Sequence, residues 1–152
     1  MAALEVTHDI KADPEAVWSI VVAMDDWVDV IEAIESVERL DDGDGFDLGT
    51  TWRETRTMFG KKATEDMEVT EFEDGRRYAT AAESHGSKYF SEITVEPTDA
   101  GCRITMGFRG EPQSTLAKVM DVTVGRLFMG ATRKALARDL ADIGAAAEAA
   151  GS

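Results

Sequence analysis

The stretch TWRETRTMFGKKATEDMEV, residues 51–69, holds two runs of alternating polar and apolar residues on either side of Gly60. Alternation with a period of two is typical of β-strands, and a glycine between two such runs indicates a tight hairpin turn. If Gly60 and Lys61 are the turn residues, Arg56 lies opposite Glu65. One face of this hairpin is then uniformly polar, and the other carries Trp52, Glu54, Arg56, Met58, Ala63, Glu65, Met67 and Val69.

The residues on both sides of this hairpin continue the same pattern. Together with the turn at 60–61, turn signals at 42–45, 74–75, 85–86 and 99–101 divide residues 36–109 into six strands, and residues 4–10 alternate as a further strand. The sequence therefore predicts seven antiparallel strands. Their inner face extends through Tyr78, Thr80, Ala82, Tyr89, Ser91, Ile93, Val95, Cys102, Ile104, Met106 and Phe108.

Two short helices are expected after the first strand and one long helix at the end of the chain. Pro14 suits the first position of a helix, and apolar spacing places a second helix around Asp26 to Ile34. Residues 113–148 return to helical spacing, with a frayed tail expected after about residue 144. Because a sheet with one apolar face needs a cover, we expect this helix to lie across the sheet in an α+β fold.

Small side chains meet where the last helix is expected to cross the sheet. The helix carries Gly125, Gly130 and Ala131, and the sheet offers Ala63 and Ala82. Side chains this small leave space, so the sequence predicts a cavity of the kind that holds small molecules. The expected ligand-binding residues are Trp52, Met67, Tyr78, Thr80, Tyr89, Ser91, Met106, Phe108, Met129 and Thr132.

The charge balance argues against polyanionic partners. The 152 residues contain 30 Asp and Glu against 16 Lys and Arg, a net charge of −14, and we expect one domain spanning 1–152. Binding to nucleic acid or to an anionic membrane needs clustered basic residues, so neither is an expected partner. The basic residues of the last helix are expected to pair with Asp139 and Asp142 on its surface. A single cysteine and the absence of a leader-like segment predict a cytoplasmic protein.

Four titratable residues are candidates for chemistry. Arg56 could clamp a ligand carboxylate or enolate, with Glu54 or Glu65 as a general base. The alternative is a purely structural ion pair at the rim of the sheet. His8 lies on the apolar face of the first strand and is either a second candidate base or a core residue. Tyr78 and Tyr89 either donate to a ligand oxygen or fill the core.

The sequence predicts neither a metal nor a bound cofactor. Two His and one Cys without ligand spacing do not indicate zinc. The glycines at 43, 45 and 49 have the wrong spacing for a dinucleotide loop. Phe46 occupies a ligand position of the calcium-loop pattern, so the acidic run at 41–44 is interpreted as a polar turn.

The order of elements, together with the segments ADPEAVW at 12–18, WRETR at 52–56 and MEVTEF at 67–72, resembles the START-related helix-grip superfamily. Within it, the chain is most similar to the bacterial polyketide cyclase/dehydrase branch, over roughly Leu4 to Ile143. The resemblance implies a helix-grip fold and ligands such as sterols, lipids, plant hormones or polyketides. It implies no catalytic residue for this sequence, because no subfamily catalytic motif is present.

Three functions remain open at this point. The first is binding of a small hydrophobic molecule that bears one or two polar oxygens. The second is a polyketide-type cyclase or dehydratase that uses the same cavity. The third is a protein-interaction module with a vestigial cavity.

Overall fold

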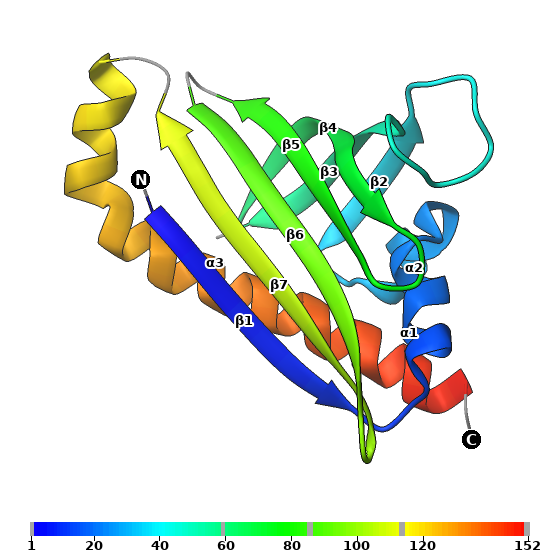
Figure 1. Cartoon of the computed structure of the whole chain (residues 1–152). Helices are drawn as coiled ribbons and strands as arrows, with labels where there is room; N and C mark the ends of the chain where they lie inside the picture. The colour runs from blue at the N-terminus through cyan, green and yellow to red at the C-terminus, as the bar shows by residue number, and fades with distance from the viewer. Residues whose placement is uncertain (1, 59, 85–86, 113–114, 151–152) are drawn as a thin grey trace.

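The computed structural model describes the backbone at residues 2–58, 60–84, 87–112 and 115–150, and side chains at 4–57, 60–83, 88–111 and 130–150. A long C-terminal helix crosses a strongly twisted sheet, and two short helices follow the first strand (Figure 1). The elements in chain order are β1 (Ala2–Ile10), α1 (Pro14–Val21), the 3₁₀ turn η1 (Met24–Asp26), α2 (Trp27–Val30), β2 (Ile34–Arg39), β3 (Thr51–Met58), β4 (Lys61–Glu73), β5 (Arg77–Ser84), β6 (Ser87–Thr98), β7 (Gly101–Pro112) and α3 (Thr115–Ala150).

The sheet has seven strands in the order β1-β7-β6-β5-β4-β3-β2. Consecutive strands from β2 to β7 pair antiparallel. β1 pairs antiparallel with β7 and forms one edge of the sheet. The predicted antiparallel sheet, the two short helices and the covering C-terminal helix are therefore confirmed. No helix in the part of the chain that the structure describes is long and apolar enough to cross a membrane.

The predicted register of the β3–β4 hairpin is wrong by two residues. Arg56 lies opposite Ala63, and Glu65 lies opposite Glu54. The reason is the position of Gly60, whose φ of +77° suits the second residue of the turn, whereas the sequence interpretation made it the first. A slip of two residues keeps every side chain on its predicted face, since side chains alternate with a period of two.

The second helix is shorter than predicted. It ends at Val30, and Ile34 already begins β2. Ile31 has an extended conformation, with φ −105° and ψ 109°, and β-branched residues favour extended backbone. Ile31 and Ile34 are both buried, although both lie outside the helix.

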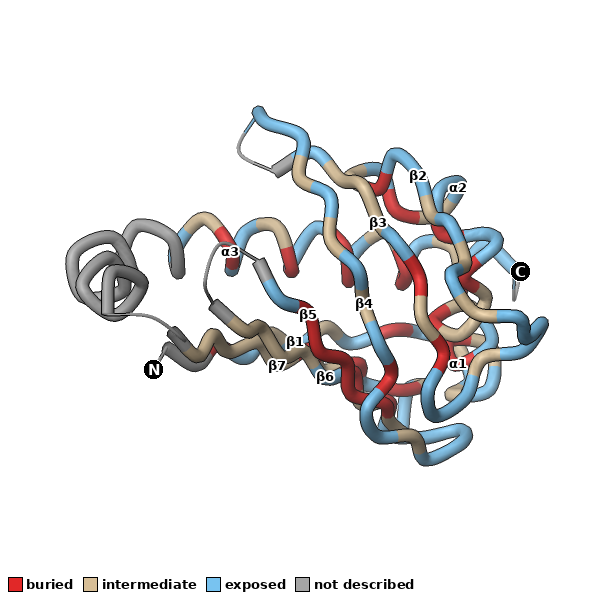
Figure 2. Tube along the Cα trace, turned by 90° about the horizontal axis from the view of Figure 1, so that it is seen from above, coloured by how far each residue is buried: buried red, intermediate tan, exposed pale blue. Residues whose placement is uncertain are grey.

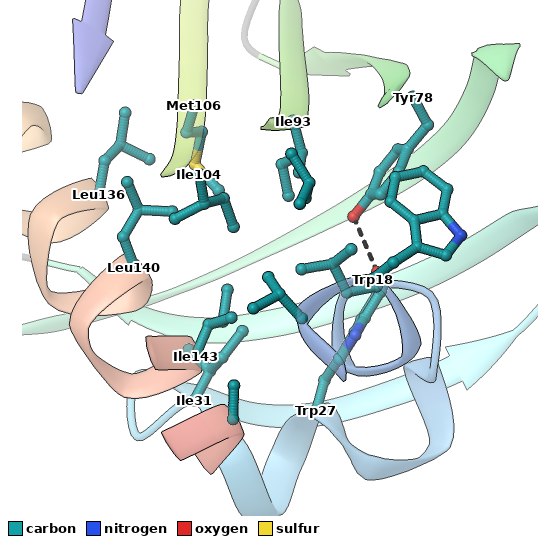
Figure 3. Close-up of a cluster of buried hydrophobic side chains, with 14 of the residues drawn as sticks. Trp18, Trp27, Ile31, Tyr78, Ile93, Ile104, Met106, Leu136, Leu140 and Ile143 are labelled. Atoms are coloured by element: carbon teal, nitrogen blue, oxygen red, sulfur yellow. Dashed lines mark hydrogen bonds between the residues drawn. The ribbon is translucent and has the colours of Figure 1, made fainter. Parts of the chain in front are cut away.

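Buried side chains from α1, α2, the sheet and α3 form one hydrophobic core (Figure 3). Trp18, Trp27 and Tyr78 occupy one side of it, and Leu140 and Ile143 of α3 occupy the other. Seen from above, buried positions of α3 alternate with exposed ones along the helix (Figure 2). One face of α3 is therefore committed to the interior.

Acidic side chains fasten the last turns of α3 to the loops beside it. Glu148 accepts a hydrogen bond from the backbone N–H of Lys11 at 2.8 Å, and Asp142 accepts one from the N–H of Glu32 at 3.1 Å. The helix continues to Ala150, and Ala147 is fully buried. Asp142 thus binds the segment after α2, whereas the sequence suggested that it pairs with basic residues of its own helix.

Candidate functional site

The main polar feature of the interior is an ion pair that joins β3 to α3. Nη1 of Arg56 lies 3.0 Å from Oδ2 of Asp139. Asp139 is only 3% exposed. Because α3 also packs against β1 and β7 at the other side of the sheet, this ion pair closes the sheet around the helix. A buried charge needs a partner of this kind, since an unpaired one strongly destabilises the fold.

Glu54 is the second carboxylate of this cluster. It lies two residues from Arg56 on the same face of β3 and accepts a hydrogen bond from Arg56 Nε at 3.2 Å. Its other oxygen lies 3.5 Å from the indole nitrogen of the buried Trp52. One guanidinium is therefore shared by two carboxylates. Together Arg56, Glu54 and Asp139 carry a formal charge of −1 when all three are ionised.

Burial and charge act in opposite directions on this cluster. Burial raises the pKa of Asp139 above its ordinary value, and Arg56 only partly reverses that effect. Burial alone would lower the pKa of Arg56, but Asp139 and Glu54 outweigh it and leave that pKa raised. Arg56 and Asp139 nevertheless lie 3.0 Å apart, the distance of a direct ion pair.

Among the described side chains of α3, residues 130–150, two buried polar atoms have no hydrogen-bond partner. They are Oδ1 of Asp139 and Oγ1 of Thr132. Thr132 is 1% exposed, and the two residues are seven positions apart, on the same side of the helix. Buried polar atoms without a partner are rare in native proteins and cost free energy, so each needs an explanation.

The other two titratable candidates, Glu65 and His8, lie at different distances from this cluster. Glu65 is half-buried on the inner face beside Glu54, where the register places two carboxylates opposite each other. His8 is half-buried on β1, at the far edge of the sheet from β3. A Cβ on Gly144 would lie 3.0 Å from the imidazole of His8, so this ring packs directly against α3. Packing against the helix agrees with the core interpretation of His8.

The residues expected to line the cavity fall into two groups by burial. Trp52, Tyr78, Thr80 and Met106 are buried. Met67, Tyr89, Ser91 and Phe108 are half-buried although they lie on the same face of the sheet. The rings of Tyr89 and Phe108 stack with centroids 5.7 Å apart, and the hydroxyls of Thr80 and Ser91 hydrogen-bond to each other. The side chain of Met129 lies outside the described residues.

The hydroxyl of Tyr78 makes a hydrogen bond inside the core. That group donates a hydrogen bond to the carbonyl of Val21 in α1 at 3.1 Å (Figure 3). Burial raises the pKa of Tyr78 far above its ordinary value. Its hydroxyl therefore remains protonated and links β5 to α1.

Phe46 packs against the aromatic side of the core, a contact that the sequence analysis missed. It lies in the loop between β2 and β3, and its ring centroid is 4.8 Å from that of Tyr78 and 5.8 Å from that of Trp52. Its loop was interpreted only as a polar turn because of its acidic residues. The available signal was the lone aromatic residue among aspartates and glycines, a composition in which a ring has little reason to occur unless it is buried.

Asp41 holds this loop in place. It accepts hydrogen bonds from the backbone N–H groups of Thr51 at 2.8 Å and Gly43 at 2.7 Å, and it pairs with Arg39 at 2.6 Å. The N–H of Thr51, then Arg39 and Gly43, lower the pKa of Asp41 from 3.8 to about 2. The ionised side chain therefore fixes the loop that carries Phe46.

Replacing Asp41 with Asn is expected to destabilise the protein in a pH-dependent way. Because the folded-state pKa is lowered to about 2, the contribution of Asp41 is fully present above 3.8 and is lost as the pH falls toward 2. The difference in unfolding free energy between wild type and Asp41→Asn should thus shrink between pH 5 and pH 2, measured by urea denaturation. The exposed neighbour Asp42, changed to Asn, is the control. A gap that stays constant over this range would show that Asp41 does not act through its charge.

No three described His, Cys, Asp and Glu side chains gather into a group that could hold a metal ion. Within the described part of the chain, the group available for chemistry is the charged cluster of Arg56, Glu54 and Asp139, which lies among apolar and aromatic side chains. It can accept hydrogen bonds, orient a polar group, and hold or move a proton at a carboxylate.

A curved antiparallel sheet closed around a long C-terminal helix defines a helix-grip protein. The model of one family, described as "Polyketide cyclase / dehydrase and lipid transport", matches residues 1–145. The chain therefore belongs to the polyketide cyclase/dehydrase and lipid transport family. A search of curated proteins found no match.

Solved structures with the same fold extend across nearly the whole chain. The Thermus thermophilus protein TTHA0849 is 17% identical with a TM-score of 0.80, and the match covers 99% of this chain and 100% of that one. The Zhui aromatase/cyclase from Streptomyces sp. R1128 is 16% identical with a TM-score of 0.75, covering 99% and 96%. The di-domain aromatase/cyclase StfQ of the steffimycin biosynthetic pathway is 12% identical with a TM-score of 0.80, covering 99% of this chain and 52% of that one. At these identities the likeness shows the fold alone.

Proposed function

We propose that this protein binds a small hydrophobic molecule between the inner face of its sheet and α3. The observation that carries the proposal is the change in burial along the inner face of β6. Val95 and Ile93 are 2% and 7% exposed, whereas Ser91 and Tyr89, further along the same face, are only half-buried. Side chains on the inner face of the sheet that still contact solvent fit an open space between the sheet and α3, and Figure 2 shows where burial along the strands changes from buried to intermediate.

The composition around this space supports the same proposal. Ligand sites in proteins are mostly apolar, with a few polar groups that fix the orientation of the ligand. Here Tyr89, Phe108 and Met67 supply apolar surface, and the cluster of Arg56 and Asp139 supplies polar atoms. The family description, which includes lipid transport as well as cyclases, agrees with a hydrophobic ligand.

The test fills the proposed space from the sheet. Ala82 lies on the inner face of β5 opposite Tyr89, and Glu83 is the next residue on the outer face. Ala82→Phe should weaken binding of the neutral dye Nile red by about tenfold or more, about 1.4 kcal/mol, because the added ring would occupy the space that the dye fills. Glu83→Phe adds the same ring outside and should leave binding unchanged. Equal binding in both variants would show that the dye does not bind beside Ala82. Mass spectrometry of compounds that co-purify with the wild type would identify a native ligand.

A second candidate function is a cyclase or dehydratase reaction in the same space. The specific observation in its favour is the pair of carboxylates, Glu54 and Asp139, on one guanidinium at the inner face. A carboxylate held there could remove a proton from a carbon next to a ligand carbonyl. Turnover of an aromatic β-keto analogue that disappears in Glu54→Gln, with Nile red binding retained, would establish this function. Binding without turnover would leave the first.

A further inference from the structure

We infer that the ligand is a neutral molecule whose hydroxyl group donates a hydrogen bond to Oδ1 of Asp139 and whose second polar group meets Oγ1 of Thr132. This inference rests on the proposed function and adds the polar chemistry of the ligand. It differs from the sequence expectation that Arg56 clamps a ligand carboxylate or enolate.

The two oxygens of Asp139 have different surroundings. Oδ2 lies 3.0 Å from Arg56 Nη1, whereas Oδ1 is buried without a partner. Because Oδ2 reaches a residue of the inner face of β3, the carboxyl group lies between the helix and the sheet. A carboxylate oxygen in this position is an acceptor, so the group that satisfies it must be a donor.

Thr132 provides the second point of contact. Its Oγ1 is buried without a partner on the same side of α3, two helical turns before Asp139. Seven residues of helix span about 10 Å. Leu136 lies between the two positions and is 7% exposed. The helix therefore presents an apolar surface with one polar atom at each end, which fits a rigid apolar ligand with a polar group at each end.

The charge of the cluster disfavours an anionic ligand. Arg56 already contacts Glu54 at 3.2 Å and Asp139 at 3.0 Å, so its positive charge is shared between two carboxylates. A ligand carboxylate would have to displace one of these carboxylates or lie beside them, and like charges in a poorly solvated site repel strongly. A neutral hydroxyl meets no such cost.

The experiment compares four probes of one skeleton on the full-length protein: naphthalene, 2-naphthol, 2-naphthoate and 2-acetylnaphthalene. We expect 2-naphthol to bind about tenfold or more tightly than naphthalene, because a hydrogen bond to a charged acceptor is strong in a dry site. The ketone and the carboxylate offer no donor and should bind no better than naphthalene. Affinities are measured by competition with Nile red.

Two variants locate the contacts. Asp139→Asn keeps the shape of the side chain and removes its charge, and it should reduce the preference for 2-naphthol over 2-naphthoate. Thr132→Val keeps the volume of the side chain and removes the hydroxyl, and Thr132→Ser restores it. The additional affinity of 2,6-dihydroxynaphthalene over 2-naphthol should vanish in Thr132→Val and persist in Thr132→Ser. The Thr132 pair also tests the inference if Asp139→Asn does not fold.

The outcomes separate this inference from the proposed function. Binding of all four probes with equal affinity, or preference for the ketone or the carboxylate, would overturn the inference and leave a hydrophobic site in place. Failure of every probe to bind would overturn the proposed function and the inference with it. Preference for 2-naphthol that is unchanged in Asp139→Asn would place the donor contact elsewhere and would also overturn the inference.

Discussion

Replacing Arg56 with Met is expected to lower the free energy of unfolding by about 3–5 kcal/mol, because it leaves the buried Asp139 without its counter-ion. The methionine retains most of the apolar length of the arginine, so the loss reports the charge more than the packing. Urea denaturation at neutral pH measures this change. The effect is large because Asp139 is 3% exposed and the side chain of Arg56 is 17% exposed.

The double variant Arg56→Met/Asp139→Leu should recover part of this loss. Replacing both partners of a buried ion pair with apolar residues removes the uncompensated charge, and the coupling energy between contacting residues is about 0.5–3 kcal/mol. Arg53 and Asp66 form the control, since they pair at 2.8 Å on the outer face of β3 and β4. Their side chains are 47% and 56% exposed, so their coupling should be too small to resolve. Equal coupling in the two cycles would mean that the pair between β3 and α3 is solvated like a surface pair.

The elements of the fold could be predicted because their signals are local. Pro14 begins α1, as expected, and Gly60 and Gly75 have positive φ in the turns that the sequence indicated. The faces of β3 and β4 were also correct, because alternation alone decides them. Their register was not, since two registers that differ by two residues bury the same side chains. The conformation of the turn at Gly60 distinguishes these registers, and the strand pattern does not contain it.

The candidate site was predictable only on its sheet side. Glu54 and Arg56 were identified because they are charged residues on an otherwise apolar face of a strand. Asp139 was assigned to the surface of the last helix, although it follows Thr132 and Leu136 at helical spacing on the buried side. Its partner is more than 80 residues away in the sequence, on a strand whose distance from the helix depends on how far the whole sheet curls. No local pattern contains that information.

The described inner side of α3 has two parts, one of apolar core residues and one that carries polar atoms without partners. Leu140 and Ile143 are 0% and 2% exposed and lie in the core with Ile104 (Figure 3). Thr132 and Asp139 carry the two polar atoms without partners. If the first part maintains the fold and the second holds the ligand, substitutions in the two parts should affect stability and binding separately.

Leu140→Ala is therefore expected to lower the free energy of unfolding by about 2–5 kcal/mol, through lost apolar contact and the cavity that remains among Leu136, Ile143 and Ile104. Leu48→Ala is the control, because Leu48 is 64% exposed and its truncation should change stability by less than about 0.5 kcal/mol. Provided that Leu140→Ala remains folded, its affinity for 2-naphthol should fall by clearly less than in Ala82→Phe, because the side chain of Leu140 packs in the core, and any loss measures its coupling to the neighbouring Asp139. A loss of affinity as large as that of Ala82→Phe would place the ligand against Leu140, and α3 would then not be divided. If Leu140→Ala strongly lowers the free energy of unfolding but leaves the affinity for 2-naphthol unchanged, different residues of α3 stabilise the fold and bind the ligand.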